Sequence, residues 1–244
     1  PQHRRVLVNE WIAAAFLHYL GISAPEAAMV QITESYLAGD ADTYIQLGRE
    51  RRAVTPGWHF GSRFPGDPAR TVVYDFLPDT LLDTVENLSD FCAVLAFDKW
   101  MGNADSRQAI FFRAQVLQPL VVGHNPDETR RLGFVAQMVD NGYVFDGPHW
   151  RLGESAIQGL YFRPLVYRTV RGLAEFEPWL SRIRNFPEEV VDQAVKRIPP
   201  AWLEGDEDDL ERLLEGLMRR RTRVPDLIEQ CGSAPSNPFP NWRP

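Results

Sequence analysis

The sequence predicts an α+β fold in two parts, and three observations point to it. The first part, up to about residue 76, mixes a long amphipathic helix with strand-like runs. A second group of strand-like runs lies between residues 109 and 139. From Gly159 onward the pattern is helical. A mixed segment, a small group of strands and a helical segment thus follow one another, so a two-lobed α+β arrangement is expected, with the boundary between residues 76 and 82.

The composition limits the classes of protein to which the chain can belong. It has 244 residues, of which 44% are hydrophobic and 24% charged, as is typical of soluble globular proteins. The net charge of −7 argues against general nucleic-acid binding, which requires a basic face. Cys92 and Cys231 form neither a disulfide framework nor a zinc motif, so a reducing cytoplasm is expected. With no signal peptide and no apolar run of about 18 residues, neither export nor a membrane span is expected.

The first half is expected to begin with a helix over residues 3–20. Val8, Ile12 and Phe16 recur at helical spacing, and Gly21 follows the last turn. The rest of this half is expected to hold a strand over 28–33, a loop with a short helix over 36–52, a long loop over 55–67, a strand over 70–76 and a short helix or turn over 79–86.

Glu10 lies in the first helix and admits two interpretations. It is either a solvated side chain or an acidic residue near the start of the helix, favoured by the helix dipole. Alternatively, it is directed at a cationic partner in a neighbouring strand. The helix by itself favours the first interpretation.

A short polar loop over residues 103–108 follows a helix that is capped by Asn87 or Ser89 and ends at Gly102. The loop contains one carboxylate, Asp105, together with carboxamide side chains, and a strand begins directly after it. Phosphoryl-transfer enzymes hold a catalytic base and a metal ligand in such connections. The alternative is that these polar groups only cap the helix and form the turn.

Three strand-like runs come next, over residues 109–114, 117–122 and 132–139, and the last ends at Asp140. One aspartate therefore precedes this small sheet and another closes it. Neighbouring strands can bring Asp105 and Asp140 close together although they are far apart in sequence.

The remaining chain is expected to be helical, with a loose tail over residues 234–244. Helices are expected over 161–170, 176–183, 188–197 and 210–223, with a further turn at 226–230. The acidic run Asp206–Asp209 is expected to complement a helix dipole rather than to bind a metal.

Several stretches are more informative together than singly: LVNEWIAAAFLHYLGISAPEA, FGSRFPGD with VVYDFLPD, FDKWMGNADSRQAIFF, MVDNGYVFDGPHW, and IPPAWLEGD followed by LMRRRTRVPDLI. Over most of the chain they resemble the HipA-like kinases, a bacterial branch of the protein-kinase-like fold. The Asn-x-Asp core is short, but an apolar helix before it, a strand after it and a later hydrophobic-hydrophobic-Asp make it more specific. The resemblance implies a truncated N-lobe over 1–78, a mostly helical C-lobe over 79–233 and the tail over 234–244.

The resemblance also implies roles for individual residues. Asp105 matches the catalytic-loop aspartate, which orients or deprotonates the attacking hydroxyl. Asp140 matches the aspartate that holds Mg²⁺ against the ATP phosphates. Glu10 matches the helix glutamate that pairs with a phosphate-binding lysine. Asp75, Phe76 and Leu77 fall where the hinge between the lobes offers backbone groups to adenine.

The chain departs from the family in two ways. The family places an asparagine metal ligand five residues after the catalytic aspartate, where this chain has Ile110; Gln108 and Asn103 are the substitute candidates. The phosphate-binding lysine and any glycine-rich strand would precede Pro1, and Lys99 lies on the wrong helix to replace that lysine. The start without Met favours a kinase that has lost an N-terminal segment over a degenerate relative.

The resulting expectation is an ATP- and Mg²⁺-dependent kinase that phosphorylates a serine or threonine hydroxyl of a protein in the cytoplasm. The alternative is a pseudokinase or protein-interaction module that keeps the fold without catalysis. A metal phosphohydrolase that uses the two aspartates is weaker, because such sites usually gather more carboxylates or histidines around two metals.

Overall fold

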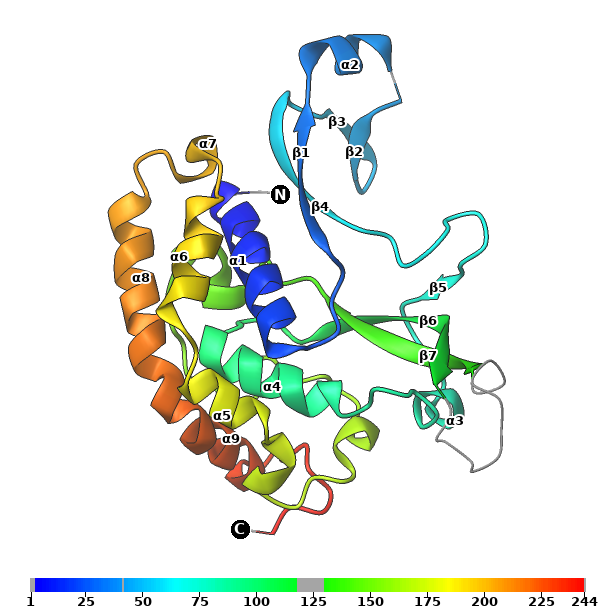
Figure 1. The fold of residues 1–244 in the computed structure, drawn as a ribbon, viewed down its shortest axis with the longest axis vertical. Coiled ribbons are helices and arrows are strands. Elements are labelled where there is room, and N and C mark those ends of the chain that lie inside the picture. Colours follow the sequence, from blue (N-terminus) through cyan, green and yellow to red (C-terminus); the bar gives the residue numbers. More distant parts are fainter. Residues whose placement is uncertain (1–2, 41, 118–129, 244) are drawn as a thin grey trace.

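The structure is a computed structural model that describes residues 3–40, 42–117 and 130–243. It is a mixed fold of helices and small sheets (Figure 1), which confirms the predicted combination of α and β structure. The longer helices are α1 (Arg4–Leu20), α4 (Asp90–Met101), α6 (Glu188–Lys196), α8 (Glu207–Arg220) and α9 (Val224–Ser233). The short ones are α2 (Glu34–Gly39), α3 (Asp79–Leu82), α5 (Trp179–Arg184) and α7 (Pro200–Leu203). None of the described helices is both long and apolar enough to cross a membrane.

Helix α1 forms where its periodicity predicts it. The ring nitrogen of His3 accepts a hydrogen bond from the backbone N–H of Arg5 at 3.2 Å and caps the first turn, and the helix ends before Gly21. Its apolar stripe, including Ile12 and Phe16, is fully buried. This stripe faces the helical body of the protein, since α1 packs against α6 and α7.

Helix α4 is the centre of the core, and all of its residues from Asp90 to Met101 are buried. Trp100 of α4 stacks on Phe16 of α1 with ring centroids 5.6 Å apart, and the indole N–H of Trp100 donates to the carbonyl of Leu217 in α8. Helix α1 therefore shares one hydrophobic core with the C-terminal helices. A helix expected in a separate N-lobe is thus built into the helical body.

The described strands form three small antiparallel sheets. One pairs β1 (Ala27–Ile32) with β4 (Gly57–Ser62), and a second pairs β2 (Tyr44–Leu47) with β3 (Glu50–Ala53). The prediction of a long loop over 55–67 is therefore wrong in its centre, and the segment 36–52 holds a hairpin as well as the expected short helix. The glycines and prolines of this segment are typical of a loop, but pairing with β1 makes β4 a strand.

The third sheet has the order β5–β6–β7, with β5 (Val73–Tyr74) at its edge and the hairpin of β6 (Gln108–Leu117) and β7 (Arg130–Val139) beside it. The register of the hairpin runs from Gln108 opposite Val139 to Leu117 opposite Arg130. The strand expected over 70–76 is reduced to two residues. Most of the strand expected over 117–122 falls outside the described residues.

The C-terminal region is helical as predicted, with three differences. The turn expected at 226–230 is part of the longer helix α9. The helix expected over 161–170 is replaced by the 3₁₀ turn Pro164–Tyr167, followed by a second turn at Leu173–Phe176. The tail is held against the body instead of being loose, because Phe239 is buried, with its ring edge-on to those of Tyr167 and Phe176.

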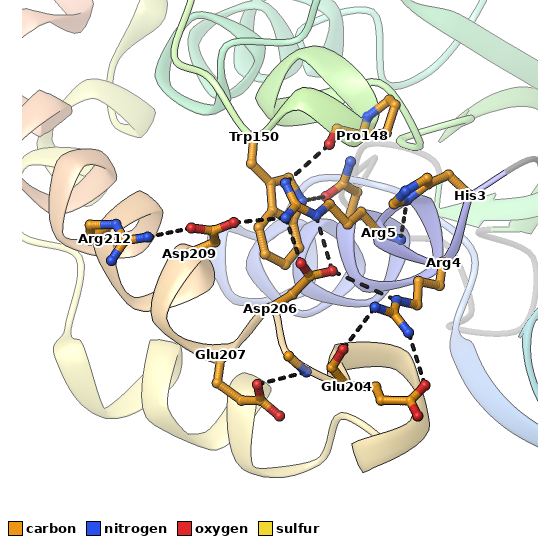
Figure 2. A network of polar contacts seen from close by, with 12 residues as sticks. His3, Arg4, Arg5, Pro148, Trp150, Glu204, Asp206, Glu207, Asp209 and Arg212 are labelled. Atoms are coloured by element: carbon orange, nitrogen blue, oxygen red, sulfur yellow. Dashed lines mark hydrogen bonds and ion pairs between the residues drawn. The ribbon is translucent and has the colours of Figure 1, made fainter.

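A polar network fixes the start of α1 to the start of α8 (Figure 2). The guanidinium of Arg5 donates to both carboxylate oxygens of Asp206, at 3.1 and 2.6 Å, and to Asp209 at 2.8 Å. The same guanidinium lies over the ring of Trp150, 4.3 Å from its centroid. Asp206 of the expected acidic run therefore lies before the first turn of α8 and pairs with an arginine. Asp209 lies within that first turn.

This network predicts an acid-sensitive stability. Hydrogen bonds from Arg5, partly opposed by burial, hold the pKa of Asp206 below its ordinary value. The pair therefore stabilises the fold fully above the carboxyl pKa of the unfolded chain, about 3.9, and this stabilisation is lost as the pH falls through the lower native pKa. Between about pH 4 and pH 2 the melting temperature of wild type should fall more steeply than that of Asp206→Asn. Parallel melting curves for the two proteins would contradict the assignment.

Candidate functional site

Asp105 and Asp140 lie at the same end of the β6–β7 hairpin. Asp105 stands three positions before the start of β6, and Asp140 directly follows β7, whose Val139 is opposite Gln108. The two loops are joined by a hydrogen bond from the N–H of Ala104 to the carbonyl of Tyr143, at 3.0 Å. The hairpin therefore brings together the loops that carry the two aspartates, and both Asp105 and Asp140 are exposed.

The loop that carries Asp105 is held in place by the buried side chain of Asn103. The Oδ1 of Asn103 accepts from the N–H of Asp105 at 3.1 Å, and its Nδ2 donates to Asp98 at 2.9 Å. Gly102 allows the sharp exit from α4, because its φ is 62° and a Cβ there would lie 3.3 Å from Leu152 Cα. Asn103, a candidate metal ligand, thus has both ends of its amide engaged and only 1% of its surface exposed. The structure gives it a role in positioning the loop.

A buried ion pair anchors the whole site. The guanidinium of Arg107 pairs with Asp98, and neither side chain is exposed. It also donates to the carbonyl of Val139 at 2.8 Å and to the Oδ1 of Asn141 at 3.0 Å. Burial opposes the charge of Arg107, but Asp98 beside it keeps the pKa of this guanidinium above its ordinary value. One side chain therefore connects α4, the loop after it and the end of β7.

The carboxylate of Asp140 is presented by an unusual backbone and one amide. Asp140 has a φ of 61°, in the left-handed region that only a few non-glycine residues adopt. Its Oδ2 accepts a hydrogen bond from the Nε2 of Gln108 at 2.8 Å. Gln108 is thus adjacent to the aspartate that it was expected to assist, although the amide is three residues and not five after Asp105.

Glu10 reaches the same region from α1. Its two carboxylate oxygens accept from the backbone N–H of Asn141 at 3.0 Å and from its Nδ2 at 3.3 Å. A Cβ added at Gly142 would lie 3.6 Å from Glu10 Oε1 and 3.9 Å from Asp140 Oδ1, so the two carboxylates flank this glycine. Burial raises the pKa of Glu10, the hydrogen bonds from Asn141 lower it, and the charge of Asp140 raises it further. In the described structure the partner of Glu10 is therefore Asn141.

Lys99 does not reach the site. It is 3% exposed, and its ammonium donates to the carbonyls of Ser155, Ala156 and Gln158 at 2.8, 3.1 and 2.7 Å. Burial lowers the pKa of Lys99. These contacts bear out the expectation that Lys99 cannot replace a phosphate-binding lysine.

Sequence reasoning missed Asn9, which is fully buried beside Glu10 on α1. Its Nδ2 lies 2.9 to 3.0 Å from the carbonyls of Gly142, Val144 and Gly147, and its Oδ1 accepts from the indole of Trp150 at 2.9 Å. Asn9 therefore holds the backbone that follows Asp140. A polar residue on the apolar face of a predicted helix was the available signal, because a buried amide must find partners.

The segment Asp75–Leu77 leaves β5 towards the site. Strand β5 is antiparallel to β6, with Tyr74 opposite Phe111, so the chain beyond it runs towards the end of β6 that carries Gln108. The carbonyl of Leu77 accepts from Arg163 at 2.6 Å, and the same guanidinium lies 4.6 Å from the ring centroid of Phe76. Hinge contacts to adenine remain a prediction for these residues.

The donor set at this end of the hairpin fits a hard cation that also binds phosphate. Mg²⁺ usually takes one or two carboxylates and completes its shell with water and phosphate oxygens. Asp140 supplies the carboxylate, and Gln108 can offer its Oε1 while its Nε2 stays on Asp140. Within the described ranges, no group of three or more His, Cys, Asp or Glu residues is placed to hold a metal ion.

Comparisons with known proteins leave the family resemblance as a proposal. A scan against protein-family models, a search of curated proteins and a search of solved structures each find no match for this chain.

Proposed function

We propose that this protein is an ATP- and Mg²⁺-dependent phosphotransferase of the HipA-like class that acts on a serine or threonine hydroxyl of a protein. The observation that carries the proposal is the pair of exposed carboxylates, Asp105 and Asp140, at one end of the β6–β7 hairpin. The proposal requires a catalytic base and a metal ligand that both reach the bound substrates, and loops at one end of a hairpin can supply them.

Each residue of the site has a task in this proposal. Asp140 and Gln108 would hold Mg²⁺, which neutralises charge on the ATP phosphates when it is bound. Asp105 would accept the proton of the substrate hydroxyl, and its exposure lets a protein side chain approach. Glu10 fixes Asn141, the residue after Asp140, through two hydrogen bonds. A cytoplasmic location and a protein substrate belong to the same proposal.

Two observations favour the second candidate, a pseudokinase or interaction module. Ile110 lies in β6 opposite Gln137, so the position at which the family has a metal-binding asparagine is part of a strand. Both carboxylate oxygens of Glu10 accept hydrogen bonds from Asn141, so this side chain already has a partner. In this alternative the same fold serves as a binding surface.

Thermal shift measurements with ATP separate the two candidates. The phosphotransferase should gain several degrees in melting temperature with ATP and Mg²⁺ together, because a ligand at 100 times its Kd adds about 2.7 kcal/mol. ATP without Mg²⁺ should give a smaller shift, and Asp140→Asn should abolish the part that depends on Mg²⁺. Asp208→Asn is the control, because Asp208 is exposed on α8, and it should respond as wild type does. Absence of any shift in the full-length protein would favour the module.

A further inference from the structure

Helices α6 and α8 lie side by side (Figure 1) and leave a groove between them with a volume of about 670 Å³. No residue that lines the groove belongs to the candidate site, and α8 lies across the helical body from the β6–β7 hairpin. The groove is thus a separate feature of the surface.

The floor of the groove is apolar. Both helices turn one hydrophobic stripe towards the core, and the outer edges of these stripes meet in the groove. The floor residues, which are the apolar residues that line the groove, are Val191, Val195, Leu203, Leu210, Leu214 and Met218. Val195 and Met218 are only partly buried, so apolar surface remains open to a partner.

The rim of the groove is acidic. Its carboxylates are Glu188, Asp192, Glu207, Glu211 and Glu215, and all five are exposed. The cations of the rim are Lys196 and Arg219, and Arg219 is 3.5 Å from Glu215. No ion pair among the described residues includes Asp192 or Glu211. The rim therefore carries more negative than positive charge, and Asp192 and Glu211 lack a cationic partner among the described residues.

We propose that this groove binds a basic amphipathic helix of a partner protein. Along α8 the rim runs from Glu207 to Arg219, about 18 Å at the rise of an α-helix, which matches a partner helix of about twelve residues. Such a helix would place apolar residues at i, i+3, i+4 and i+7 on the floor and lysine or arginine over the acidic rim. Apolar contact supplies the affinity, and the opposite charges supply orientation and a fast association.

Charge also argues against a second copy of this chain as the occupant. In a two-fold dimer through this groove each rim would face the same acidic rim of its partner, and like charges at such a contact are unfavourable. The lysine and arginine side chains of a basic helix would instead be attracted to the acidic rim.

The test uses a labelled synthetic helix of about twelve residues with leucine on one face and lysine on both flanks. Fluorescence anisotropy should show saturable binding, weakened at least tenfold between about 50 and 500 mM salt because the charges of the rim are screened. A peptide with the same composition in scrambled order and one with glutamate in place of lysine should each bind at least tenfold more weakly.

Variants of the protein locate the peptide. The double variant Asp192→Lys and Glu211→Lys reverses two rim charges and should weaken binding at least tenfold. The double variant Glu189→Lys and Asp208→Lys makes the same change of net charge on exposed residues of the same helices that do not line the groove, and should change the affinity less than twofold. Equal weakening by both double variants, or equal binding of the three peptides, would overturn the proposal. So would a dimer in solution that the rim variant alone dissociates.

Discussion

Replacement of Asp105 by asparagine should reduce phosphoryl transfer about 10³-fold, the usual contribution of a positioned general base. Asparagine has the same shape but cannot accept the proton of the attacking hydroxyl. It can keep the local contact of the carboxylate, because Asp105 Oδ1 accepts from the N–H of Ser106 at 2.7 Å and an amide oxygen can do the same. The loop should therefore keep its conformation while the reaction is lost.

Two measurements separate this chemical effect from misfolding. The thermal shift of Asp105→Asn with ATP and Mg²⁺ should equal that of wild type, since Asp105 is assigned to the hydroxyl and not to the nucleotide. Asp208→Asn, an equal change at a remote exposed site, should keep full activity. If Asp105→Asn retains more than about a tenth of the rate, Asp105 is not the base.

Replacement of Arg107 by methionine should destabilise the fold by about 3 to 5 kcal/mol, because it leaves the buried charge of Asp98 without a cationic partner. For a chain of this size the loss corresponds to about 10 °C in melting temperature. Arg107→Lys should also be strongly destabilised, since a single ammonium cannot reproduce the hydrogen bonds to Asp98, Val139 and Asn141.

Urea unfolding with two comparison proteins identifies the cause. Arg184→Met removes an exposed arginine and should change the free energy of unfolding by less than about 0.5 kcal/mol. The double variant Asp98→Leu and Arg107→Met should be more stable than Arg107→Met alone, because it also removes the buried negative charge of Asp98. A double variant no more stable than Arg107→Met would show that Asp98 and Arg107 are not coupled.

Much of the fold followed from the sequence wherever one pattern dominated. Apolar residues at helical spacing identified α1, α4 and α8, and the run that ends at Val139 identified β7. The strand β4 was hidden by its glycines, because only its pairing with β1 makes it a strand. The tail was expected to be loose because the burial of Phe239 depends on contacts with distant residues.

The sequence pointed to residues of the candidate site but not to most of the contacts that hold them. Asp105 stood out as a carboxylate in a helix-to-strand connection, whereas the roles expected of Asp140 and Gln108 came from the family resemblance. The role of Arg107 was not predictable, because a sequence does not distinguish a surface arginine from one that is buried against Asp98. Partners that are far apart in the chain, such as Asn9 and the carbonyl of Gly147, become visible only when the fold brings them together.

The most direct test of the account is the transfer of labelled γ-phosphate from ATP by the full-length protein, with Mg²⁺ and with wild type, Asp105→Asn and Asp140→Asn in parallel. Wild type should consume ATP and label serine or threonine in a protein substrate or in itself only when Mg²⁺ is present. Both variants should lose at least about 99% of this activity, as expected for loss of a base or a metal ligand. Equal ATP consumption by all three proteins would contradict the assignment of Asp105 and Asp140 to a phosphotransferase site.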